Sequence, residues 1–129
     1  MGESGPALSN NMNADQHNQP LYDLSMIQTM SGGDEAFMGK MIKLFIETVP
    51  QNVKELLAAT DTENWQQVSK LAHKLKSTVD SMGIKSIHDD IRQVESDAKE
   101  NRNLNSIPLT VQKINSVIHD CVEQLRTRI

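Results

Sequence analysis

The sequence predicts an all-α protein: an antiparallel up-and-down four-helix bundle with a short extra helix at its N-terminal end. Apolar residues recur at helical spacing in four long stretches that are joined by short connections. Only four aromatic residues occur in the 129, namely Tyr22, Phe37, Phe45 and Trp65, so a β-rich core would lack its usual material. The apolar residues are concentrated after residue 34, which is enough chain for one domain with a packed core.

The chain divides into a polar segment, residues 1–20, and a helical domain, residues 21–129. The first segment has few apolar residues and no periodicity, so we expect a flexible tail or linker. His17 lies in this segment without a second ligand at useful spacing, and we therefore expect no metal site there.

The first two predicted helices are separated by a glycine pair. Leu21, Leu24, Ile27 and Met30 follow one another at three-residue steps and indicate a short helix that ends at Gly32-Gly33 and covers the bundle. Asp34 is then a candidate N-cap for a long helix that runs to about Ala59. Pro50 lies inside this helix and predicts a kink or a local break near residues 47–50.

Three further helices follow. Asp61-Thr62-Glu63-Asn64 provides residues typical of a helix start, Trp65 begins the central helix and Gly83 ends it. The next helix carries Ile84, Ile87, Ile91, Val94 and Ala98 and ends in the polar residues 100–103. Ser106 and Pro108 begin the last helix, whose apolar face runs from Leu109 to Leu125 and which ends in the basic residues Arg126 and Arg128.

Methionine and cysteine are interpreted as core residues. Methionine at helical spacing is more often core filling than a plastic surface for a partner, and this applies to Met26, Met30, Met38, Met41 and Met82. Cys121 lies in an apolar pattern, so we expect a buried thiol. A single cysteine excludes an internal disulfide and fits a reducing compartment, so the predicted location is the cytoplasm. His88 and His119 are interpreted as partly exposed helix residues.

Several functional classes are disfavoured. The net charge is −4 and no basic stripe occurs, so we expect no nucleic-acid binding. No run of eighteen apolar residues and no signal segment is present, so we expect no direct membrane contact, although a membrane-bound parent protein is an open alternative. No nucleophile turn, phosphate-binding glycine loop or spaced set of metal ligands is found, so we do not expect a self-sufficient enzyme or a metal site.

The central helix carries one histidine on its solvent side. At about 100° per residue, the apolar residues from Val68 to Met82 share one direction, and His73 lies about 150° away from it. Lys70 and Lys76 lie one turn to either side of His73, and Ser69 and Ser77 lie on the same surface. An exposed imidazole is largely neutral near neutral pH, so one ring nitrogen can act as a nucleophile. The lysines could balance the charge of an attached phosphoryl group, and the serines could donate hydrogen bonds to it. On physical grounds alone, however, such a histidine is more often without function.

The segment Ala72-His73-Lys74-Leu75-Lys76, with Gly83 ten residues after the histidine, resembles the signature of histidine-containing phosphotransfer (HPt) domains. This family has a four-helix bundle with the phosphorylated histidine exposed in the middle of one helix. The resemblance implies that His73 accepts the phosphoryl group and that Lys76 stabilises it. The family's usual glycine after this lysine is Ser77 here, a difference that concerns the fit of the partner more than the chemistry. Glu95 falls where family members often carry Gln or Glu, and it is a weaker candidate for orienting His73 or Lys76.

The expected function is that of a phosphorelay carrier between response-regulator receiver domains. The resemblance implies that the receiver supplies the acidic pocket and Mg²⁺, so that this chain needs no cofactor. A hybrid sensor histidine kinase is a further candidate partner or parent, and we expect a monomer. Met38 and Ile42 are candidates for contacting the receiver. The alternatives are a non-phosphorylated adaptor that binds a receiver or kinase, and a helical interaction module unrelated to phosphorelay.

Overall fold

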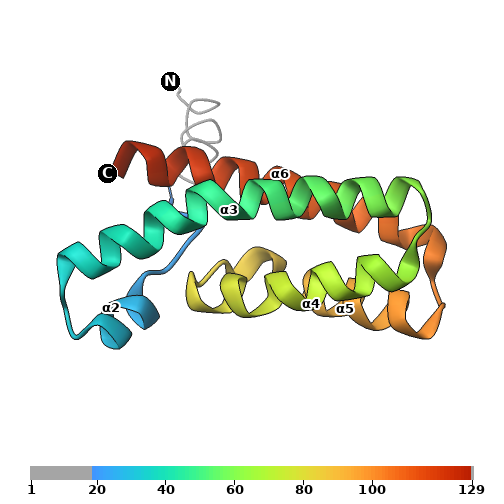
Figure 1. Ribbon diagram of the computed structural model, residues 1–129, viewed down its shortest axis with the longest axis horizontal. Helices are drawn as coiled ribbons and strands as arrows, with labels where there is room; N and C mark the ends of the chain where they lie inside the picture. Colours follow the sequence, from blue (N-terminus) through green and yellow to red (C-terminus); the bar gives the residue numbers. More distant parts are fainter. Residues whose placement is uncertain (1–18, 129) are drawn as a thin grey trace, which may run out of the picture.

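The computed structural model describes residues 19–128, and within this range it is all-helical with no strand. Four long helices, α3 (Glu35–Asp61), α4 (Trp65–Ser81), α5 (His88–Glu100) and α6 (Ile107–Arg128), run up and down along one axis (Figure 1). Each packs against two neighbours, α3 against α4 and α6, and α5 against α4 and α6. The predicted fold class is confirmed, including the short extra helix α2 (Ser25–Ser31). This helix is shorter than its apolar pattern indicated, because Leu21 and Leu24 precede it and pack against the core from a non-helical segment. The expected tail, including His17, lies almost wholly outside the described residues.

The long helix α3 begins as predicted and continues through its proline. The amides of Ala36 and Phe37 donate to the side chain of Asp34, which is the N-cap. Pro50 lies inside the helix, which is continuous to Asp61 and bends in its middle part (Figure 1). The local break that was one alternative does not occur, since a proline removes a single intrahelical hydrogen bond and the apolar face on both sides stays buried.

The central helix α4 begins at Trp65, as predicted, and ends just before Gly83. The amide of Gln67 donates to the side chain of Asn64 at 3.3 Å at the N-terminal end. Gly83 follows the C-terminal end with a left-handed φ of 62°, a conformation that glycine adopts without a steric penalty. The next predicted helix is divided into a 3₁₀ turn, η1 (Lys85–Ile87), and α5.

The connection from α5 to α6 is built around a buried carboxylate. Asp97, whose side chain is 2% exposed, accepts hydrogen bonds from the side chains of Gln93, Arg102 and Asn103. A second 3₁₀ turn, η2 (Leu104–Ser106), then leads into α6, with Pro108 in its first turn.

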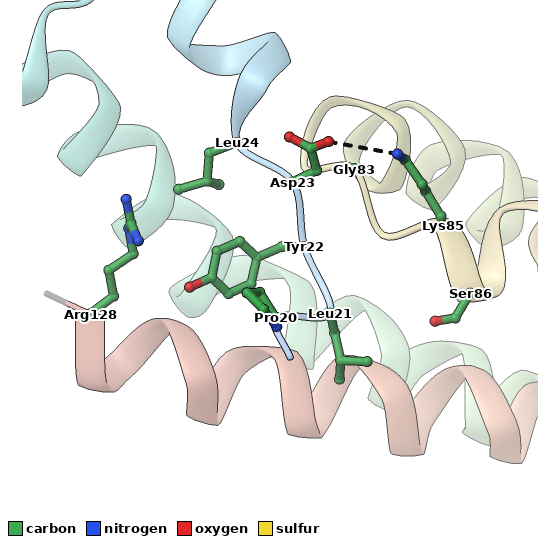
Figure 2. Close-up of a pocket in the computed structure, with 9 residues that line it drawn as sticks. All are labelled: Pro20, Leu21, Tyr22, Asp23, Leu24, Gly83, Lys85, Ser86 and Arg128. Atoms are coloured by element: carbon green, nitrogen blue, oxygen red, sulfur yellow. Dashed lines mark ion pairs between the residues drawn. The ribbon is translucent and has the colours of Figure 1, made fainter. Parts of the chain in front are cut away.

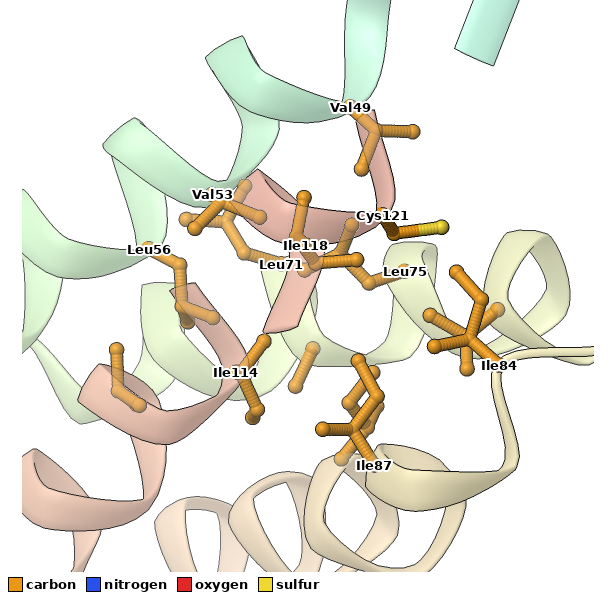
Figure 3. Close-up of a cluster of buried hydrophobic side chains, with 14 of the residues drawn as sticks. Val49, Val53, Leu56, Leu71, Leu75, Ile84, Ile87, Ile114, Ile118 and Cys121 are labelled. Carbon is orange, nitrogen blue, oxygen red and sulfur yellow. The ribbon is translucent and has the colours of Figure 1, made fainter. Parts of the chain in front are cut away.

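The core lies between the four long helices and is mainly aliphatic (Figure 3). Cys121 is fully buried among these side chains, as expected, and burial raises the pKa of its thiol to about 12. The apolar pattern overestimated the buried face at its edges, because Phe37 near the start of α3 and Leu109 near the start of α6 are exposed. No helix in the described range is both long and apolar enough to cross a bilayer.

The prediction that all five methionines fill the core is only partly correct. Met82 is buried, and Met38 and Met41 are half-buried against the core. Met26 and Met30 are exposed, because α2 is short and its one fully buried side chain is Ile27. The residues of α2 that face away from Ile27 therefore remain in solvent.

Candidate functional site

His73 lies in the middle of α4 and its side chain is 68% exposed. The neighbouring residues Ala72 and Leu75 are buried in the core, which fixes the rotation of the helix about its axis. The amphipathic pattern of α4 thus places the imidazole in solvent, on the side where α4 meets α5.

One carboxylate joins His73 to Lys76. Glu95 of α5 has one oxygen, Oε2, 2.5 Å from His73 Nδ1, and the other, Oε1, accepts a hydrogen bond from Lys76 Nζ at 3.0 Å. Glu95 is 19% exposed and Lys76 is 30% exposed, so this contact is partly shielded from water. Burial of Glu95 opposes its ionisation, but the hydrogen bonds from Lys76 and His73 outweigh this effect and lower its pKa. Glu95 is therefore a carboxylate at neutral pH, placed between two donors.

The position of this carboxylate determines which nitrogen of His73 is available. A carboxylate can only accept hydrogen bonds, so a neutral imidazole in this geometry carries its proton on Nδ1. The lone pair is then on Nε2, the nitrogen at the far side of the ring from Glu95. In this tautomer Nε2 is the nucleophilic nitrogen, and the ring is oriented by a group on the adjoining helix.

Polar contacts run along the outer edge of the α4–α5 interface on both sides of His73. The Ser69 hydroxyl donates to the Glu95 backbone carbonyl at 3.3 Å. Further along the helices, Arg92 holds Asp80 through two hydrogen bonds of 3.2 and 2.7 Å. The Arg92 hydrogen bonds are the main reason why the pKa of Asp80 lies below its usual range, although burial opposes them. These contacts fix the register of α4 against α5 at the level of His73.

The other predicted site residues are placed differently. Lys70 lies beside His73 in a groove of about 800 Å³ that Trp65, Lys99 and Glu95 also line. Ser77 is exposed and forms no side-chain hydrogen bond with the residues described. The hydroxyl of Ser69, expected above to donate a hydrogen bond to an attached phosphoryl group, donates to the backbone carbonyl of Glu95 instead. The structure therefore brings Glu95 into contact with His73 and Lys76. Lys70 and Ser77 lie on the same surface but take no part in this contact.

The prediction for the docking residues is wrong for Ile42. Its side chain is buried in the core and is not available to a partner. Met38 is half-buried, so only part of it is accessible. The large apolar side chains that are exposed on α2 and α3 are Met26, Met30, Phe37 and Leu44. Leu44 lies on the side of α3 opposite to the buried residues Ile42 and Phe45, so its exposure agrees with the amphipathic pattern.

Among residues 19–128, no cluster of three or more potential metal ligands is present. The imidazole of His88 lies 2.9 Å from Asp89 and 3.6 Å from Asp80, and this pairing belongs to the charged edge of the α4–α5 interface. His119 is exposed on α6, as expected.

Comparison with known protein families gives one match. The family model described as Hpt domain matches residues 40–128, about two thirds of the chain, from the first part of α3 to the end of α6. No curated protein and no solved structure matches the chain significantly.

Proposed function

The chain belongs to the Hpt domain family, whose role is phosphotransfer in phosphorelays, and we propose that His73 is its phosphoryl acceptor. In this proposal the donor is the aspartyl phosphate of a response-regulator receiver domain, and the phosphoryl group then passes to another receiver. The observation that carries the proposal is the contact of Glu95 with both His73 Nδ1 and Lys76 Nζ, on an otherwise solvent-exposed imidazole.

The proposed transfer step uses this geometry as follows. The lone pair of His73 Nε2 attacks the phosphorus, a P–N bond forms, and the P–O bond to the donor aspartate breaks. The receiver's carboxylate leaves with the bonding electrons, so no other reactant is needed. The imidazole becomes positively charged and keeps its proton on Nδ1, where Glu95 stabilises the cation. Donation to the next receiver reverses these changes.

Lys76 supports the phosphoryl group in this mechanism. Its ammonium is one helical turn from His73 and is held by Glu95 at 3.0 Å before the reaction. We propose that the ammonium turns toward the phosphoryl oxygens after transfer. These oxygens carry more negative charge than the Glu95 carboxylate, which Lys76 shares with His73. Lys70 lies at the edge of the same face and adds positive charge, and Ser77 lies where the receiver would approach.

The remaining parts of the reaction centre are assigned to the receiver domain. We propose that the receiver supplies Mg²⁺ and the acidic pocket, and that this chain acts as a monomeric carrier in the cytoplasm, with a hybrid sensor histidine kinase as a further candidate partner. Its own residues bind and orient the phosphoryl group without catalysing the reaction alone.

The experiment is phosphoryl transfer from a labelled receiver. The chain is mixed with a phosphorylated receiver, and acid-labile, base-stable phosphate on the chain is measured. We expect label on the wild type and on the control His119→Ala, and none on His73→Ala. Label retained by His73→Ala would refute the assignment of the acceptor. Receiver binding without any transfer would favour the adaptor, and absence of binding would favour an unrelated helical module.

A further inference from the structure

Residues 19–24 form an extended segment, here called the strap, that crosses one end of the bundle from α6 to the turn after α4 (Figures 1 and 2). The side-chain amide of Gln124 binds the strap twice: its Oε1 accepts from the Leu21 amide at 2.7 Å, and its Nε2 donates to the Gln19 carbonyl at 3.0 Å. At the other end of the strap, the Asp23 amide donates to the Met82 carbonyl at 2.9 Å. All three hydrogen bonds recognise the backbone of the strap.

The strap passes in close contact with Gly83, which lies beside Asp23 (Figure 2). A Cβ atom at this position would lie 2.5 Å from the carbonyl oxygen of Asp23 and 2.9 Å from its nitrogen. Gly32 has nearly the same backbone conformation, with a φ of 64° against 62°, but a Cβ atom there would meet nothing within 4 Å. Glycine at position 83 is therefore required by the turn and also by the close approach of the strap.

The strap continues into α2, which covers the end of the bundle. Ile27 of α2 is fully buried, and Met26 lies with Val79 and Ile84 around a groove of about 300 Å³. The connection from α2 to α3 consists of Gly32, Gly33 and the N-cap residue Asp34, and both glycines have a left-handed φ. Such a pair adopts other backbone angles at little cost and can serve as a hinge.

We propose that the strap and α2, residues 19–31, form a releasable lid, hinged at Gly32-Gly33 and latched by Gln124 and by the fit of Asp23 on Gly83. Two of the three latching hydrogen bonds depend on one side chain, and the apolar side chains of the strap itself are only half-buried. A groove of about 510 Å³ lies along the strap beside Arg128, so this side of the strap is loosely packed. The ion pair of Asp23 with Lys85, at 3.7 Å, joins two exposed side chains and adds little to the latch (Figure 2). Seven residues are too few for α2 to persist alone as a helix. The lid should therefore open well below the free energy of global unfolding.

Opening the lid would uncover Val79 and Ile84 where the helix bearing His73 ends. This apolar surface is hidden while the latch is closed. The lid is a conformational device that the proposed phosphotransfer does not require, and its test does not depend on phosphorylation.

The test is amide hydrogen exchange on the full chain, followed by NMR. In the wild type we expect the Leu21 and Asp23 amides to exchange at least tenfold faster than core amides such as those of Val53 and Ile118. Gly83→Asn should accelerate strap exchange at least a further tenfold, because asparagine tolerates a left-handed φ but its Cβ displaces Asp23. The control Gly39→Asn places the same side chain inside α3, where an added Cβ meets nothing within 4 Å, and should change strap exchange less than threefold.

A second pair of variants tests the latch without touching the turn. Gln124→Ala removes both hydrogen bonds, whereas Gln124→Glu keeps an oxygen for the Leu21 amide and loses the donor to Gln19. We expect Gln124→Ala to accelerate Leu21 exchange more than Gln124→Glu does. The proposal is wrong if strap amides are as protected as the core in the wild type. It is also wrong if Gly83→Asn and Gln124→Ala accelerate strap and core exchange equally.

Discussion

Replacing Glu95 by glutamine is expected to slow phosphoryl transfer to His73 by between about 5-fold and 30-fold. The carboxylate accepts from His73 Nδ1 and from Lys76 Nζ, and in the proposed mechanism it stabilises the positive charge that the imidazole gains during transfer. A hydrogen bond to a charged group contributes about 1.5–3 kcal/mol when it is shielded. Glu95 is 19% exposed and glutamine keeps one acceptor oxygen, so we reduce the expected loss of transition-state stabilisation to about 1–2 kcal/mol. This loss corresponds to a rate reduction of between about 5-fold and 30-fold.

The assay is single-turnover transfer from an excess of phosphorylated receiver, combined with ¹⁵N NMR of the imidazole. Glu95→Gln should reduce the rate, and Glu95→Ala should reduce it further and allow both tautomers of His73 to be populated. Glu100→Gln, a change of the same kind at an exposed residue near the end of α5, should leave both observables unchanged. Wild-type transfer rates in both Glu95 variants, with a single tautomer in Glu95→Ala, would show that the carboxylate neither orients the ring nor stabilises its charge.

Three further predictions concern the scaffold. Leu56→Ala should lower the free energy of unfolding by about 2–5 kcal/mol in urea titrations because Leu56 is fully buried, whereas Leu109→Ala, at a side chain 73% exposed, should have little effect; equal losses would contradict the assignment of the core. Asp97→Asn should cost about 2 kcal/mol at pH 7 by weakening three hydrogen bonds. Burial opposes ionisation of Asp97, but these hydrogen bonds outweigh it and lower its pKa, so the stabilisation is present above the unfolded pKa of about 3.9. It disappears as the pH falls through the lower folded value, and a difference from wild type that grew on acidification would be evidence against this account. Cys121 should resist thiol reagents at pH 8 until the chain unfolds, because burial raises its pKa to about 12; rapid labelling of the folded protein would refute its burial.

Hydrogen bonds along the outer edge of the α4–α5 interface connect the two helices on both sides of His73. Ser69, Lys76 and Asp80 of α4 are all bonded to α5, through Glu95 or Arg92. The His73 ring is thus oriented by a carboxylate whose own backbone is tied to α4. A partner would meet an imidazole that is exposed but already aligned, which lowers the entropic cost of reaching the reactive geometry.

The sequence alone determined the fold class, the approximate extent of the four long helices and the centre of each buried face. The capping residues Asp34 and Asn64, the terminating Gly83 and the burial of Cys121 follow from local rules that need no knowledge of neighbouring helices. The exposure of His73 also follows, because the apolar stripe of α4 fixes the direction of the core.

Only the tertiary structure decided how these faces are aligned with one another. Periodicity defines the direction of a helix face but not the register between two helices. It therefore does not predict that Glu95 contacts both His73 and Lys76, which lie 22 and 19 residues earlier in the chain. The burial of Ile42 and the exposure of Met26 depend on how far α2 and α3 overlap, which side-chain type does not encode. The second reason for Gly83, the strap that rests on it, comes from a segment sixty residues earlier in the chain. Such contacts arise from the packing of the whole bundle, in which the shape of every core side chain decides the relative height of the helices.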